Sequence, residues 1–222
     1  MIPSFRFASL LPLVFALVLG SFCGADIIQI DYPAQKEGYR PVGIIEIADG
    51  FLLAGEILDS ATGWDISLLW LTRELKAREH KTLSGDRMDS LRKICKINDG
   101  FLLLSTSSSR QGDIQARYGM QDLNMIRLNT QGKIVWTRAF GGSGVNQAQD
   151  LFVDDLNETI TVLCWANSGG GTISRAYGGW DIAVVRYDFS GNLKWTTILG
   201  GDQDDLMGSL YCERNRIYVL YN

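Results

Sequence analysis

Residues 122–129, DLNMIRLN, belong to a pattern that occurs three times along the chain. The same order, an acidic residue followed by a nearly unbroken apolar run, appears as DISLLWLT at 65–72 and as DIAVVRYD at 181–188. The opening acidic residues are 57 and 59 residues apart. A fixed period of this length predicts a repeat architecture in which neighbouring units bury each other's apolar faces.

Glycine and tryptophan positions follow the same period. Gly85, Gly142 and Gly201 are again 57 and 59 residues apart, and an Asp or Asn follows each of them by four positions. The stretch NTQGKIVWTRAFGG at 129–142 matches DFSGNLKWTTILGG at 188–201. These landmarks divide the chain into the units 38–85, 86–142 and 143–201, with a partial unit at 202–222.

Each unit contains four short apolar segments separated by Gly, Asp, Asn and Ser, which predicts a four-stranded antiparallel sheet. Both faces of the third segment are apolar, with Leu69, Ile126 and Val185 on one side and Ile66, Leu123 and Ile182 on the other. An antiparallel sheet with one wet face would alternate apolar and polar residues. We therefore expect sheets covered on both sides, and a β-propeller meets that requirement.

The phased set of DGF turns at 49–51 and 99–101, WDI at 180–182, GNLKW at 191–195 and the glycine pairs resembles the secreted bacterial β-propeller repeats of the delta-60 or SBBP type. The resemblance covers residues 26–222 and implies an exported propeller. The G-x-x-x-W element at 132–136 and 191–195 is also similar to quinoprotein-like propeller repeats, in which the Trp docks on the next blade.

The repeat units do not add up to a closed propeller. The strand from Asp26 aligns with the last strand of a blade, three complete blades follow, and the chain ends after two strands of the next. A first strand joined to those two would give a three-stranded closing blade, but we favour a shortened form of a longer propeller, with self-association through exposed blade edges. In the first unit, residues 72–86 lack the turn glycine and the Trp, so a fourth strand near 77–83 has weak support.

The amino terminus predicts export. Arg6 precedes an apolar run from Leu10 to Leu19, too short for a transmembrane helix, which fits a signal peptide over residues 1–25 and a repeat domain over 26–222. We expect a secreted, periplasmic or outer-membrane-associated protein without a transmembrane segment. The alternative is a lipoprotein anchored through Cys23.

The charge of the chain restricts its possible partners, and the placement of its cysteines indicates their thiol state. The net charge is −4, with 21 basic and 25 acidic side chains and no basic cluster, which argues against nucleic acid as a partner. Cys95, Cys164 and Cys212 fall in apolar runs and are expected to be buried free thiols, although a disulfide between two of them stays open.

Catalytic signals are weak. His80 is the single histidine and is expected to be solvated in a charged segment, so neither a Ser/His/Asp triad nor a histidine metal cluster is expected. The acidic turns at 154–158 and 202–205 lack EF-hand spacing and are expected to be polar turns rather than calcium ligands. We predict no catalytic residue, no metal and no cofactor.

The loops between second and third strands carry the candidate binding residues. These are Tyr118, Tyr177, Trp180, Arg117 and Arg175, whose aromatic and guanidinium groups suit carbohydrate or protein recognition unless they only pack the blade edges. The sequence thus favours a non-catalytic scaffold or binding module for protein or glycan. The alternatives are a glycan-acting hydrolase or lyase with carboxylates at the propeller axis and, more weakly, a quinone enzyme.

Overall fold

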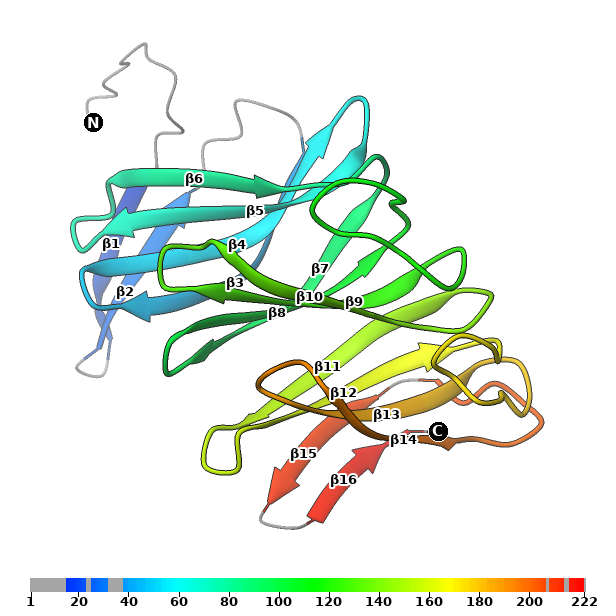
Figure 1. The fold of residues 1–222 in the computed structure, drawn as a ribbon. Coiled ribbons are helices and arrows are strands. Elements are labelled where there is room, and N and C mark those ends of the chain that lie inside the picture. The colour runs from blue at the N-terminus through cyan, green and yellow to red at the C-terminus, as the bar shows by residue number, and fades with distance from the viewer. Residues whose placement is uncertain (1–14, 23–24, 32–37, 207, 214–215, 222) are drawn as a thin grey trace.

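The computed structural model describes residues 15–22, 25–31, 38–206, 208–213 and 216–221. Within these ranges the regular elements are sixteen β-strands in antiparallel sheets (Figure 1). Three sheets have four strands each and two have two strands. The prediction of an all-β chain built from repeated four-stranded sheets is confirmed.

Each sheet consists of consecutive strands, so every connection joins neighbours. The first sheet contains β3 (Tyr39–Ile47), β4 (Gly50–Asp59), β5 (Gly63–Thr72) and β6 (Ala77–Leu83). The second contains β7 (Asp89–Ile97), β8 (Gly100–Ser107), β9 (Asp122–Asn129) and β10 (Ile134–Phe140). The third contains β11 (Asn146–Asp154), β12 (Thr159–Ala166), β13 (Asp181–Asp188) and β14 (Leu193–Leu199), and a partial sheet follows with β15 (Ser209–Glu213) and β16 (Arg216–Leu220).

The apolar core lies between successive sheets. The third strands β5, β9 and β13 are buried over most of their length on both faces. Leu68 and Ile126 meet in the cluster between the first and second sheets, and Phe140 and Val185 in the cluster between the second and third. Neighbouring sheets therefore cover both faces of the middle sheet, as the apolar pattern predicts.

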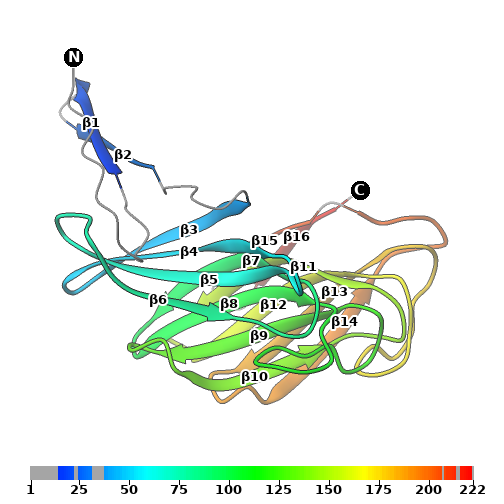
Figure 2. The ribbon, with the colours of Figure 1, turned by 90° about the horizontal axis from the view of Figure 1, so that it is seen from above.

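The first strands of the sheets follow one another around a common axis. β3 contacts β7, β7 contacts β11, and β11 contacts β15. Lys93 Nζ on β7 lies 2.7 Å from Asp150 Oδ1 on β11, and the Leu210 amide on β15 donates to Asp150 Oδ2 at 2.9 Å. The sheets fan out from these strands as the blades of an incomplete propeller (Figures 1 and 2).

The first sheet has the fourth strand, β6, that the sequence supported only weakly. In the turn before it, Leu75 adopts a φ of 61°, where Gly132 and Gly191 of the later units have φ of 69° and 78°. A left-handed backbone costs a leucine about 1 kcal/mol. Burial of the Leu75 side chain against Leu69 and Leu71 offsets that cost, so the turn forms without glycine.

The tryptophan that the first unit lacks on its fourth strand is present on its third. Trp70 on β5 is in register with Glu79 on β6, the residue at the Trp136 position. The Trp70 ring packs against Gly132 in the second sheet, and Trp136 Nε1 donates to the Phe189 carbonyl in the third at 3.1 Å. Each Trp therefore docks on the turn between the third and fourth strands of the following sheet.

The amino-terminal strands form a sheet of their own. β1 (Phe15–Phe22) pairs with β2 (Ala25–Asp31), and β2 does not join β15 and β16, so the three-stranded closing blade is absent. Pairing with the adjacent segment closes a far shorter loop than pairing across the whole chain. Residues 1–14 and Cys23 lie outside the described residues, which include no helix long and apolar enough to cross a membrane.

The cysteines of the repeat region are free thiols. Cys164 and Cys212 are buried and Cys95 is half-buried, without a disulfide between any two of them. Burial raises the pKa of Cys164 to about 12, so this thiol stays protonated. Free buried thiols were the expected state, and these side chains act as small apolar groups in the core.

Candidate functional site

Two sets of loops meet at one end of the sheets, which we call the rim. The loops 108–121 and 167–180 join second to third strands, and the segments 84–88 and 141–145 lead from one sheet to the next. Backbone hydrogen bonds link the two sets: the Asp113 amide donates to Ser84 O at 2.8 Å, and the Met120 amide to Gly144 O at 2.7 Å. The rim is therefore one connected layer of loops.

Asp122, the first residue of β9, holds the loop that precedes it. Its fully buried carboxylate accepts the amides of Arg117 at 2.5 Å, Tyr118 at 2.6 Å and Gly119 at 3.2 Å. Asp181 repeats the arrangement in the third sheet, where its Oδ2 accepts the Tyr177 amide at 2.7 Å. In the second and third sheets, the recurring acidic residue is thus an anchor for the rim loops.

The glycine pair at the end of the fourth strand makes room for that anchor. A Cβ on Gly141 would overlap Asp122 Oδ1 and lie 2.8 Å from Asn146 Nδ2. A Cβ on Gly200 would likewise overlap Asp181 Oδ1 and lie 2.9 Å from Asp205 Oδ2. The backbone passes directly over two polar side-chain groups, and only glycine leaves space for them.

The structure places the five sequence-predicted binding residues on the rim, four of them beside packing partners. The Arg175 guanidinium lies 4.0 Å from the centre of the Tyr177 ring. Trp180 packs edge-on against Trp165 of β12, with ring centres 6.4 Å apart. Tyr118 packs against Gly171 of the next loop, and its ring is exposed, as is the Arg117 side chain. The rim thus brings two of the loops together, and among the described residues the Tyr118 and Tyr177 rings do not stack on each other.

A polar pocket of about 410 Å³ opens beside these loops, between the first strands of the second and third sheets. Its lining consists of Met88, Ser90, Leu91, Arg92, Thr106, Gln121, Gln147, Ala148, Gln149 and Trp165. We call it the axial pocket because β7 and β11 contribute most of these residues. It contains three side-chain amides, two hydroxyls, a guanidinium and an indole.

Several contacts fix the walls of the axial pocket. Arg92 Nε donates to the Gln149 carbonyl at 2.9 Å, joining β7 to β11. The Ala148 amide donates to Thr106 Oγ1 at 2.9 Å, joining β11 to β8. Trp165 Nε1 is buried and has no hydrogen-bond partner among the described residues. The pocket is therefore held by both sheets.

The residues of the axial pocket were not predicted from the sequence. The signal was present in NQAQD at 146–150, where Gln147 and Gln149 alternate with small or buried residues on a strand that lines the axis. Polar residues on such a strand resemble ordinary surface alternation, because the sequence does not show which strand faces the axis. Arg92 and Gln121 carry no motif that distinguishes them.

The prediction of a solvated His80 is wrong. Its ring is half-buried on β6, with Nε2 2.9 Å from Ser67 Oγ, and burial lowers its pKa. Ser67 is fully buried, so this Ser–His contact has no access to a substrate. The Ser67 hydroxyl on β5 lies within hydrogen-bond distance of the imidazole. The charged residues beside His80 in the sequence gave no indication of this partner.

The acidic side chains of both turns accept hydrogen bonds from backbone amides. Asp154 Oδ1 accepts the Asn157 amide at 3.1 Å, and Asp204 Oδ1 accepts the Trp180 amide at 2.9 Å. Among the described residues, His, Cys, Asp and Glu side chains form no group of three or more that could hold a metal ion. Asp154 thus organises its own turn, as the turn preference of Asp predicts, whereas Asp204 joins the polar stretch after β14 to the rim loop 167–180.

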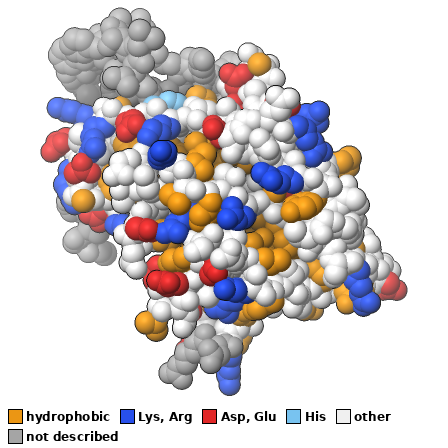
Figure 3. Space-filling view, viewed as in Figure 1, with side chains coloured by type: hydrophobic (Ala, Val, Ile, Leu, Met, Phe, Trp, Pro, Cys, Tyr) orange, Lys and Arg blue, Asp and Glu red, His pale blue; other side chains and the backbone are white. Residues whose placement is uncertain are grey.

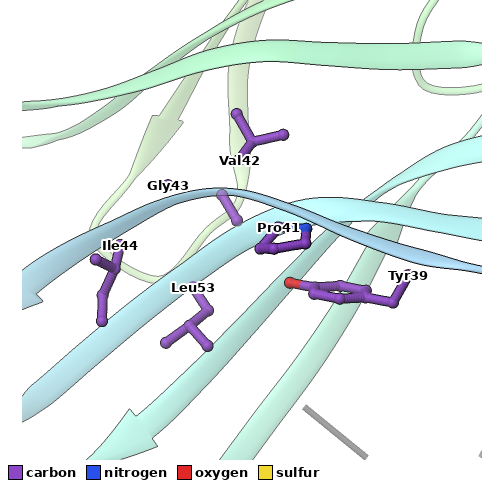
Figure 4. Close-up of a pocket in the computed structure, with 7 residues that line it drawn as sticks. Tyr39, Pro41, Val42, Gly43, Ile44 and Leu53 are labelled. Atoms are coloured by element: carbon purple, nitrogen blue, oxygen red, sulfur yellow. The ribbon is translucent and has the colours of Figure 1, made fainter. Parts of the chain in front are cut away.

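A second cavity, of about 360 Å³, lies on the first sheet. Tyr39, Pro41, Ile44 and Leu53 are among its lining residues, and Figure 4 shows Val42 directed away from the Tyr39 ring. The lining is apolar apart from the Tyr39 hydroxyl. This cavity therefore offers few groups for recognising a polar ligand.

The sequence matches no protein-family model, and no curated protein matches it. The features available for assigning a function are thus the repeats, the rim and the axial pocket of the chain itself. Figure 3 adds that basic and acidic side chains are interspersed over the face shown there.

Proposed function

We propose that this protein is an exported, non-catalytic β-propeller of the secreted bacterial delta-60 or SBBP repeat type, acting at the cell surface or in the periplasm. It binds a glycan in the axial pocket, and the rim loops beside the pocket contribute further contacts. The phased repeats and the apolar amino-terminal run support the family and the export. The chemistry of the axial pocket supports the ligand.

The observation that carries this proposal is the mixture of groups in one pocket. Side-chain amides donate and accept hydrogen bonds, as sugar hydroxyls do. Gln121, Gln147 and Gln149 supply three amides, and Trp165 adds an aromatic surface. A pocket of about 410 Å³ has the size of a small-ligand site. A neutral, hydroxyl-rich ligand matches this lining.

The hydrolase or lyase alternative requires a proton-donating carboxyl beside a carboxylate at the axis. Asp150 is an acidic residue of an axis-lining strand, and it is engaged in structural contacts. Burial acts to raise its pKa, but hydrogen bonds from Lys93 and from the Leu210 and Leu151 amides outweigh this and keep the pKa lowered. Asp150 therefore stays ionised and joins three sheets, which favours binding over catalysis.

A glycan array followed by calorimetry on the best ligand tests this proposal. We expect Gln147→Ala combined with Gln149→Ala to weaken binding at least about tenfold, because lost hydrogen bonds to a desolvated ligand each cost about 1 kcal/mol or more. Tyr177→Ala and Trp180→Ala report on the rim, where a smaller loss is expected. Ile44→Ala, in the apolar cavity of the first sheet, is the matched control.

Three results would contradict the proposal. The first is binding that is unchanged in the double glutamine variant. The second is release of reducing sugar or unsaturated product during incubation, which would establish an enzyme. The third is an array without any glycan binding together with capture of a protein ligand that competes at the same glutamines, which would replace glycan by protein as the partner.

The partial sheet predicts self-association. Tyr211, Tyr218 and Leu220 are 57%, 46% and 74% exposed, and the Tyr211 and Tyr218 rings are 6.0 Å apart. Uncovered apolar faces and free strand edges favour contact between copies. We expect the mass measured by light scattering to rise with concentration and Tyr218→Lys to reduce the rise. A mass that stays monomeric over about a hundredfold range of concentration would contradict this expectation.

A further inference from the structure

Two carboxyl groups approach each other where the third sheet meets the partial sheet, a place that we call the third joint. Asp181 is the first residue of β13, and Asp205 lies in the segment that leads from β14 to β15. A Cβ built on Gly200 would overlap Asp181 Oδ1 and lie 2.9 Å from Asp205 Oδ2. The two oxygens therefore flank the same point of the backbone, close enough for one cation to contact both.

The equivalent place between the second and third sheets, which we call the middle joint, holds a hydrogen-bond donor. A Cβ on Gly141 would overlap Asp122 Oδ1 and lie 2.8 Å from Asn146 Nδ2. That nitrogen donates toward Asp122 Oδ1 at 3.4 Å and toward two backbone carbonyls at 3.0 and 3.3 Å. It thus supplies positive hydrogens to a group of oxygens. In the third joint an oxygen, Asp205 Oδ2, takes the place of the nitrogen.

Asp181 has fewer hydrogen-bond donors than its counterpart Asp122. Asp181 is fully buried, its Oδ2 accepts the Tyr177 amide at 2.7 Å, and its Oδ1 has no hydrogen-bond partner among the described residues. Asp122 accepts three backbone amides as well as the Asn146 side chain. A buried carboxylate needs donors or a cation to offset its lost hydration. Asp181 Oδ1 lacks such a group on the side that faces Gly200 and Asp205.

The charge of the pair is not offset by a basic side chain. In the part of the chain that the structure describes, neither Asp181 nor Asp205 forms an ion pair with a lysine or arginine. Arg175 of the adjoining rim loop stacks on the Tyr177 ring instead. The neighbouring Asp204 accepts the backbone amide of that loop at 2.9 Å and adds a further negative charge. The third joint therefore has an excess of negative charge.

Backbone carbonyls are available to complete an oxygen shell. The two carbonyls around the amide nitrogen of the middle joint belong to Gln121 and Gly142. By the repeat spacing, Trp180 and Gly201 hold these positions in the third joint, and Trp180 O accepts the Asp205 amide at 2.6 Å. Calcium takes about six to eight oxygens from carboxylates, carbonyls and water, and it tolerates irregular geometry. Two carboxylates with carbonyls and water suit calcium better than magnesium, which requires a regular octahedron.

We propose that Asp181 and Asp205 bind a calcium ion at the third joint. Asp181 Oδ1 and Asp205 Oδ2 are the two charged ligands, and the Trp180 and Gly201 carbonyls and water complete the shell. Asp205 is half-buried, so the ion enters from solvent on that side. The ion replaces the side-chain amide of the middle joint and ties the rim loop 167–180 to the segment before β15. The sequence gave only a polar turn at 202–205, because the buried partner comes from another strand.

Calorimetry with calcium chloride and thermal unfolding test the inference. The wild type is expected to bind calcium and to melt at least about 4 °C higher in millimolar calcium than in EDTA, because the ion binds only the folded state. Asp205→Asn is expected to lose both responses and to melt in EDTA at least as high as the wild type, because its amide supplies the missing donor. Asp202→Asn, in the same acidic stretch, is the matched control and should keep the calcium response.

Asn146→Asp is the converse, because it recreates two facing carboxyl groups in the middle joint. It is expected to melt lower than the wild type in EDTA and to recover most of that loss in millimolar calcium. A wild type without a calcium response, or an undiminished response in Asp205→Asn, would overturn the proposal. So would an equal rise in acid with EDTA that Asp205→Asn abolishes, since a proton would then hold the pair. These measurements involve no glycan, so their outcome is independent of the proposed function.

Discussion

Asp122→Ala is expected to lower the free energy of unfolding by about 4 kcal/mol, the largest effect of any substitution considered for this protein. The carboxylate is fully buried and accepts three consecutive amides of the rim loop. Alanine leaves those donors without an acceptor in a space that water does not fill readily. Urea unfolding followed by tryptophan fluorescence measures the change.

Asp202→Ala is the control for this measurement. Asp202 is exposed and lies in the polar stretch after the third sheet, so its loss is expected to change stability by less than about 0.5 kcal/mol. An equal effect of the two substitutions would show that Asp122 does not anchor the loop. The interpretation of the repeated acidic residue as a structural anchor would then be wrong.

Gly141→Ala is expected to cost about 3 kcal/mol, the second largest effect. The new methyl group would overlap Asp122 Oδ1, and that carboxylate cannot move aside without breaking its amide hydrogen bonds. Asn146 Nδ2 lies 2.8 Å from the same methyl position, so the methyl group cannot shift away from Asp122 without meeting Asn146. The same urea titration reports the loss.

Gly201→Ala provides the matched comparison from the next glycine pair. A Cβ at Gly201 meets no described atom within 4 Å, so little change is expected there. If Gly141→Ala and Gly201→Ala were equally tolerated, the explanation of the first glycine of each pair as a close-approach site would not hold. Asp122→Ala combined with Gly141→Ala should be less destabilised than the two single losses together, since the clash partner is gone.

The repeats made the sheets predictable because their apolar residues recur on both faces of each third strand. Leu123 and Ile126 of β9 point to opposite sides and are both fully buried, which only a sheet between two neighbours explains. The positions of glycine and tryptophan were less reliable guides to the turns and to the contacts between sheets. Leu75 takes a glycine's place because its side chain gains burial there, and Trp70 docks from the third strand instead of the fourth.

The functional site was less predictable because it depends on which strand faces the axis. Gln147 and Gln149 line the axial pocket only because β11 is the first strand of its sheet. The aromatic rim residues were conspicuous in the sequence, yet Tyr177 and Trp180 each have a local packing partner. A one-dimensional pattern identifies exposed aromatic loops readily and does not reveal a pocket formed by two sheets.

The first strands of successive sheets lie side by side around one axis. Cross-linking tests this arrangement, with Lys93→Cys and Asp150→Cys introduced together after Cys23, Cys95, Cys164 and Cys212 are replaced by alanine. Lys93 and Asp150 are in contact in the structure, at 2.7 Å between Nζ and Oδ1. A short bismaleimide should join the two cysteines within one folded molecule, and urea should abolish the reaction. Failure of the folded protein to cross-link, with both thiols reactive, would contradict the stacked-sheet arrangement.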